Sequence, residues 1–202
     1  MLRYNFQLFG GRGASGGAGG SGGGFSYKET DITEEDWYDW QLDPEPFQDA
    51  LAYGTVPSYG AEGKRLSREE QERIYNVAHQ MQINSERTIF RDITTVYRGE
   101  SYDSLNEAMR RYKTGTTIQT NKLTSYTTSK SVASEYAGAG ERAIKVLHIV
   151  TNSKGTVGLK VPNSNEIVSP KGLSYRVTST DYNKSTGLLK VYLFGTNKRS
   201  RK

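Results

Sequence analysis

The sequence contains no cysteine and only two histidines, His79 and His148. Disulfide bridges and thiolate metal sites are therefore excluded, and two histidines are too few for a histidine-rich metal site. No apolar run approaches the ~18 residues of a transmembrane helix, and the N-terminus lacks the apolar segment of a signal peptide. We therefore expect a protein that acts in the cytoplasm, with no metal cofactor and no membrane partner.

Apolar residues are also scarce, at 34% of the chain, partly because the chain contains 22 glycines. Ten of the fifteen residues 10–24 are glycine, and such a segment cannot repay the entropy of ordering, so we expect a flexible linker. Before it, apolar and polar residues alternate over residues 1–9. That alternation is typical of a short strand that docks on a sheet edge, and the alternative is a disordered start.

The net charge of +5 is unevenly distributed, since residues 28–49 hold nine acidic residues and one lysine. We interpret residues 25–66 as an acidic N-terminal extension with a helix, which either docks on a basic domain after it or packs with its acidic face in water. Residues 197–202 form a basic tail. Because no aromatic residues are interleaved with it, a solvated end is favoured over a nucleic-acid site.

Helical signals come early in the chain and strand signals follow. Thr33 is placed to cap a helix over residues 33–42, and Ser67 with Glu70 forms a capping box that opens a helix to about Met81. Further helices are expected from Ser104 to Gly115 and over 131–137. Period-two patterns predict strands at 94–98, 122–128, 143–151, 156–161, 166–168, 174–180 and 188–194. Helices followed by a run of strands predict an α+β fold with a largely antiparallel sheet.

One candidate site residue is Arg98, which is followed by Gly99 at the expected end of a strand. The planar guanidinium donates two parallel hydrogen bonds to a diphosphate, and a glycine leaves backbone room for a ligand. The alternative is an ordinary surface ion pair.

Two further polar groups follow. The hydroxyls of Thr127, Thr128 and Ser129 could hold a carboxylate or contact a ribose, or they could form a strand end with a helix cap. Glu166 begins a short strand, where a carboxylate could face the positive charge that develops at an anomeric carbon as a glycosidic bond breaks. The alternative is a solvated charge on an edge strand.

Together these motifs resemble those of the mono-ADP-ribosyltransferases of the arginine–serine–glutamate class, which includes clostridial binary toxins and vertebrate ecto-enzymes. The runs concerned are Tyr97-Arg98-Gly99, Leu123–Ser129 and Asn165–Gly172. The resemblance implies the ADP-ribosyltransferase fold, with N-terminal helices packed on a largely antiparallel two-sheet β core. It implies a catalytic domain over residues 67–196 and NAD as the substrate.

The resemblance also implies roles for individual residues. Arg98 and Gly99 would bind NAD, Thr127 would orient Glu166, Thr128 and Ser129 would support it, and Glu166 would stabilise the oxocarbenium ion. Ser164 stands at the family's acceptor-side position, where Glu goes with arginine acceptors. Because serine cannot hold a guanidinium as a carboxylate does, the acceptor stays open.

The functional prediction is transfer of ADP-ribose from NAD to a macromolecular acceptor, a host protein in preference to a nucleic acid. The alternatives are an NAD glycohydrolase and a non-catalytic virion or interaction protein on the same fold. Residues 5–13 also resemble the leaders of phage head and virion-associated proteins. We therefore expect a phage-encoded, toxin-like protein that acts in the host cytoplasm and is packaged in a virion through residues 1–9.

Overall fold

The computed structural model describes residues 25–60, 63–139 and 143–199. The chain divides into two compact units, Met1–Asn84 and Ser85–Lys202. The docking peptide, the glycine-rich linker and the last residues of the basic tail lie outside the described residues. The expected catalytic domain begins at residue 67, which falls inside the first unit.

The first unit contains α1 (Glu34–Leu42), α2 (Glu45–Tyr53) and most of α3 (Arg68–Arg87). The expected helix after Thr33 is confirmed, because Thr33 and Asp36 cap each other reciprocally. α2 was not predicted from the sequence. It begins after Pro44 and ends at Gly54, whose φ of 72° is the left-handed conformation that stops a helix.

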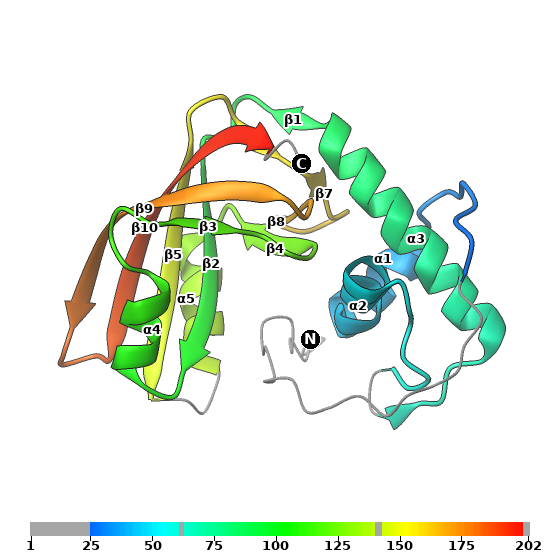
Figure 1. Ribbon diagram of the computed structural model, residues 1–202, viewed down its shortest axis with the longest axis horizontal. Helices are drawn as coiled ribbons and strands as arrows, with labels where there is room; N and C mark the ends of the chain where they lie inside the picture. Colours follow the sequence, from blue (N-terminus) through cyan, green and yellow to red (C-terminus); the bar gives the residue numbers. More distant parts are fainter. Residues whose placement is uncertain (1–24, 61–62, 140–142, 200–202) are drawn as a thin grey trace. The chain divides into compact units, whose positions relative to one another are not determined.

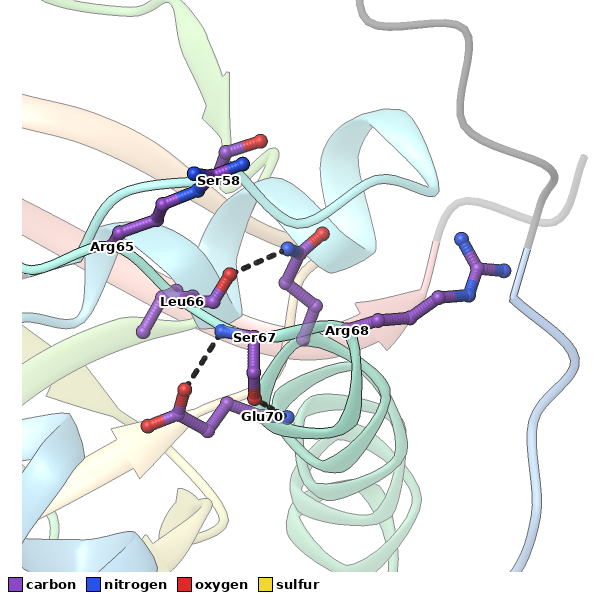
Figure 2. A pocket seen from close by; sticks show the side chains of 7 residues that line it. Ser58, Arg65, Leu66, Ser67, Arg68 and Glu70 are labelled. Atoms are coloured by element: carbon purple, nitrogen blue, oxygen red, sulfur yellow. Dashed lines mark hydrogen bonds between the residues drawn. The ribbon is translucent and has the colours of Figure 1, made fainter.

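The expected capping box of α3 is also present (Figure 2). Ser67 N–H donates to Glu70 Oε2 over 2.7 Å, and Glu70 N–H donates to Ser67 Oγ over 3.1 Å. The helix then continues beyond the predicted end at Met81 to Arg87. Its buried residues include Val77 and Met81, so apolar packing supports the middle of this long helix.

The segment before α1 is hydrogen-bonded to α3. Tyr27 Oη donates to Gln80 Oε1 over 2.6 Å, and Lys28 N–H donates to Asn76 Oδ1 over 2.8 Å. Arg73 on α3 binds Asp36 and also Asp39, the latter over 2.5 Å. Part of the acidic extension is therefore an integral part of the first unit.

The second unit is built on an eight-stranded sheet in the order β3-β9-β10-β5-β2-β4-β8-β7, with a separate pair, β1-β6. The strands are β1 (Ile89–Phe90), β2 (Thr95–Tyr102), β3 (Thr117–Gln119), β4 (Thr124–Thr127), β5 (Ile144–Asn152), β6 (Thr156–Val157), β7 (Leu159–Lys160), β8 (Glu166–Ser169), β9 (Leu173–Asn183) and β10 (Leu188–Arg199). Among the described residues, every pairing except β5 with β10 is antiparallel. The expected α+β class with a largely antiparallel sheet is confirmed.

The eight-stranded sheet has a narrow junction in the middle. β2 and β5 pair over eight residues, whereas β2 and β4 share one pair, Tyr97 with Thr127. The sheet therefore consists of a five-stranded part, which ends at β2, and a three-stranded part, which begins at β4.

Two helices cover this sheet, with α4 (Leu105–Arg111) on the face opposite α5 (Lys130–Ala139) (Figure 1). α5 packs on β2, β4 and β5, and α4 packs on β2 and β5. The apolar core of the second unit includes Val96, Val146, Val150, Leu189 and Val191, which come from β2, β5 and β10. The site residues described below come from the neighbouring strands β2, β4 and β8 and from the segment between β4 and α5.

Several strands differ from those expected. The strand expected to end at Arg98 continues to Tyr102, and the strand expected over 156–161 is divided at Gly158 into β6 and β7. β1 and β3 were not predicted, since two or three residues carry no periodic signal. Within the described ranges, no helix combines the length and apolar character needed to cross a membrane.

Candidate active site

Glu166 is the first residue of β8 and is 9% exposed. Its carboxylate oxygen Oε1 accepts a hydrogen bond of 2.5 Å from Ser125 Oγ on β4. Because β8 lies between β4 and β7, Glu166 is not a solvated charge on an edge strand. A buried carboxylate needs such partners, since losing water without them is costly.

Arg98 lies in the middle of β2, close to the single residue pair that joins β2 to β4. Its Nη1 donates to the backbone oxygen of Ser125 over 3.1 Å. Ser125 therefore contacts both residues: its carbonyl accepts from Arg98 and its hydroxyl donates to Glu166. This continuous polar connection crosses the junction between the two parts of the sheet.

Thr127 occupies the register position directly opposite Glu166, but its hydroxyl has another partner. Thr127 Oγ1 accepts a hydrogen bond of 3.0 Å from Ser129 N–H. The expectation that Thr127 orients the Glu166 carboxylate is therefore corrected, because the hydroxyl of Ser125 makes that contact. Sequence reasoning missed Ser125, although strand alternation places it on the same face of β4 as Thr127.

The arrangement combines a preorganised carboxylate with a cation two strands away. Such a pair can hold an anionic substrate at the guanidinium while the carboxylate stabilises positive charge on a reacting carbon. The chemistry requires the carboxylate to be held in place before the charge develops, and the contact with Ser125 provides this.

Several solved structures are similar in fold to this chain. The Vis toxin, an ADP-ribosyltransferase from Vibrio splendidus, aligns in complex with agmatine at a TM-score of 0.56 and 15% identity, over 83% of this chain and 77% of that chain. The same toxin with the M6 inhibitor aligns at 0.56 and 15% identity, over 81% and 72%. Exoenzyme S from Pseudomonas aeruginosa, bound to carba-NAD and in complex with human 14-3-3 protein beta, aligns at 0.50 and 15% identity, over 75% and 66%.

The chain has the ADP-ribosyltransferase fold. At this low identity the likeness concerns the fold, and it agrees with the architecture expected from the motifs. No protein-family model matches the chain, and no curated protein matches it in sequence. The finer roles of the site residues therefore rest on the geometry of this chain.

Within the ADP-ribosyltransferase fold, two backbone N–H groups donate hydrogen bonds that hold the loop before Glu166. Thr128 N–H donates to Asn165 O over 3.0 Å, and Glu166 N–H donates to Ser164 Oγ over 2.9 Å. Asn163 adopts a φ of 56°, which Asn tolerates better than most residues. Thr128 therefore acts here through its backbone, and Ser164 supports the start of β8.

Ser129 begins α5. Its hydroxyl accepts from Val132 N–H over 3.4 Å, and its carbonyl accepts from Ala133 N–H over 3.2 Å. These contacts agree with the helix-cap alternative for this residue. A contact between Ser129 and NAD stays a prediction.

The expectation that Gly99 leaves backbone room for a ligand stays a prediction, and the structure shows another reason for a glycine at this position. A Cβ at Gly99 would overlap Ala133 O and lie 2.5 Å from Ala137 N, both on α5. The missing side chain therefore lets α5 approach β2 closely. This packing also brings Tyr136 of α5 toward the site. Burial is the larger cause that raises the pKa of the Tyr136 hydroxyl, and the negative charge of Glu166 is the next.

Two surface pockets lie elsewhere. One of about 500 Å³ at the start of α3 is lined by Ser58, Arg65, Leu66, Ser67, Arg68, Glu70 and Gln71 (Figure 2). Another of about 300 Å³ is lined by Thr114, Gly115, Arg176, Val177, Thr178 and Phe194. Neither is lined by Arg98, Ser125 or Glu166. In the part of the chain that the structure describes, no group of three or more His, Asp or Glu side chains could hold a metal ion.

Proposed function

We propose that this protein is a mono-ADP-ribosyltransferase of the arginine–serine–glutamate class, which breaks the nicotinamide–ribose bond of NAD and transfers ADP-ribose to a macromolecule. The observation that carries the proposal is the polar connection from Arg98 through Ser125 to Glu166. The ADP-ribosyltransferase fold supports it, because the fold and the three side chains point to the same chemistry.

In the proposed reaction, nicotinamide leaves with the electron pair of the bond between its ring nitrogen and C1′ of the ribose. The ribose then carries oxocarbenium character, and the negative charge of Glu166 stabilises it. Arg98 binds the diphosphate through charge-assisted hydrogen bonds. An acceptor nucleophile attacks C1′ and loses its proton, and the products are nicotinamide and the ADP-ribosylated acceptor.

Ser125 fixes the rotamer of Glu166 before the substrate binds. Its hydroxyl can donate one hydrogen bond, and that bond goes to Glu166. Thr127, opposite Glu166 in the register, together with Thr128 and Ser129 remains proposed as part of the wall that contacts NAD. Glu166 needs no metal for this role, since its charge alone opposes the developing charge at C1′.

The acceptor is proposed to be a protein, in preference to a nucleic acid. The Ser164 hydroxyl, at the acceptor-side position, accepts from Glu166 N–H over 2.9 Å. It brings no negative charge for a guanidinium. This observation favours an acceptor other than arginine and also supports the second candidate, an NAD glycohydrolase in which water attacks C1′.

The proposed place of action is the cytoplasm of a host cell, with packaging in a phage virion through residues 1–9. This part rests on the sequence of residues 5–13 and on the absence of cysteine. A non-catalytic interaction protein is less well supported, because such a protein gains nothing from a buried Glu166 that a serine hydroxyl orients.

The test is incubation of the full chain with NAD labelled in its adenylate part, in the presence of a cell lysate, beside the Glu166→Gln variant. Transfer predicts label on a macromolecule and a loss of about 10²–10³-fold in the variant. Free ADP-ribose with no labelled macromolecule indicates hydrolysis. Equal turnover by both proteins, or none by either, would contradict the enzymatic proposal.

A further inference from the structure

A second polar cluster lies beside Arg98 and consists of Glu100, Tyr112 and His148. Tyr112 Oη donates a short hydrogen bond to Glu100 Oε1, and His148 Nε2 lies 2.8 Å from the same oxygen. The His148 contact has the distance of an ion pair but not the angle of a hydrogen bond. Tyr102 Oη lies 3.1 Å from Tyr112 Oη, so Tyr102 adjoins this cluster.

The cluster is buried. Tyr112 is 1% exposed and His148 is 5% exposed, and their rings meet edge to face at 4.8 Å. Burial works to raise the pKa of Glu100, but His148, Arg98 and Tyr112 outweigh it and leave the pKa well below its usual range. Glu100 is therefore a fixed negative charge inside the second unit, and a buried carboxylate with a strongly shifted pKa beside a candidate site is itself a candidate for a role in that site.

Strand geometry places this charge next to Arg98. Arg98 and Glu100 are two residues apart on β2, so their side chains lie on the same face, about 7 Å apart along the strand. His148 on β5 is the register partner of Arg98. Gly99 faces α5, so the cluster lies on the opposite face, where Tyr112 caps the end of α4.

We propose that Glu100, held by Tyr112 and His148, is a positioning residue that orients the guanidinium of Arg98 toward the diphosphate of NAD. The inference rests on the proposed function. Ser125 O accepts from Arg98 Nη1, and the negative charge of Glu100 attracts the same guanidinium through space. Tyr112 and His148 hold Glu100 Oε1 in place. The charge of Glu100 therefore attracts the Arg98 guanidinium from a fixed position, and the guanidinium can still donate to a phosphate.

The alternative is a buried polar cluster that only stabilises the fold. The two readings differ in what they do to substrate binding, because a positioning residue acts on NAD through Arg98. If Glu100 is a positioning residue, its loss raises the KM for NAD with little change in kcat, because Arg98 holds the diphosphate and not the reacting carbon. A purely structural role lowers stability and leaves the NAD affinity of the folded protein unchanged.

The test uses the full chain and compares Tyr112→Phe and Glu100→Gln with Tyr175→Phe. Tyr175 is the control, because it is also a buried tyrosine of the second unit and its hydroxyl pairs with Tyr126, whereas the hydroxyl of Tyr112 pairs with Glu100. NAD affinity is measured by calorimetry, with KM and kcat for NAD consumption. We expect both cluster variants to weaken NAD binding by about tenfold, with kcat within about threefold and the control unchanged.

A double-mutant cycle shows whether the effect passes through Arg98. In an Arg98→Lys background, Tyr112→Phe should change NAD affinity much less than in the parent protein. The inference is overturned if the cluster variants bind NAD like the control while Arg98→Lys and Glu166→Gln lose activity. If Arg98→Lys and Glu166→Gln are also without effect, the proposed function itself fails. Tyr112→Phe keeps the buried aromatic ring. This variant therefore provides the test if Glu100→Gln does not fold.

Discussion

Ser125 Oγ lies 2.5 Å from Glu166 Oε1, across the neighbouring strands β4 and β8. Thr127, two residues further along β4, is the register partner of Glu166 but contacts Ser129. The hydroxyl that orients the carboxylate is thus offset by one strand repeat from the residue directly opposite it. This offset is possible because a glutamate side chain is long enough to reach along the strand.

We expect Ser125→Ala to reduce NAD turnover on the order of 10²-fold, because Glu166 loses the donor that fixes its position. The measurement is nicotinamide release at saturating NAD. Thr124→Val is the control, since it removes a hydroxyl from the same strand on the opposite face, where Thr124 contacts Lys122 O. Thr127→Val should have a smaller effect than Ser125→Ala. The reverse order would restore the role first expected for Thr127.

Gly99→Ala should destabilise the second unit by about 1–3 kcal/mol, because the added methyl group meets the backbone of α5. Urea unfolding followed by circular dichroism measures the change. Gly138→Ala is the control on α5, since its Cβ would have Lys145 Nζ at 3.6 Å as its nearest neighbour, and it should be neutral or stabilising. A fully stable Gly99→Ala protein would contradict the close packing of α5 on β2.

Ser164→Glu should increase transfer to a guanidinium acceptor, because it places a carboxylate two residues before Glu166. Agmatine serves as the acceptor, and the yield of ADP-ribosyl agmatine is measured. Ser164→Ala is the control, since it removes the hydroxyl that accepts from Glu166 N–H and adds no charge. If Ser164→Glu gives no more product than Ser164→Ala, position 164 does not select the acceptor in this protein.

The Glu70 cap of α3 should contribute to stability in a pH-dependent way. The backbone N–H of Ser67, and then Lys64 and the Ser67 side chain, lower the pKa of Glu70 from 4.5 to about 2. A depressed pKa means that this stabilisation is present above about pH 4.5 and is lost as the pH falls toward 2. The difference in unfolding free energy between the parent and Glu70→Gln should therefore shrink from pH 6 to pH 3. A constant difference over that range would argue against the capping contact.

Much of the fold followed from local patterns. The capping boxes at Thr33 and Ser67 and the period-two segments that became β5, β9 and β10 are local signals, because a cap or an alternating strand depends on residues close in sequence. α2, β1 and β3 were missed. The short strands β1 and β3 exist because long-range partners, β6 and β9, pair with them.

The sequence by itself determined the polar groups of the site: Arg98, a hydroxyl cluster and Glu166 in that order, together with the absence of cysteine and the scarcity of histidine. Tertiary structure decided which hydroxyl meets Glu166 and what Gly99 is for. Alternation assigns Ser125 and Thr127 to one face but does not distinguish between them, and the register of β4 on β8 and the side-chain rotamers make that choice. The role of Gly99 depends on α5, a helix that begins more than thirty residues later. Its packing on β2 is a long-range contact that no local pattern contains.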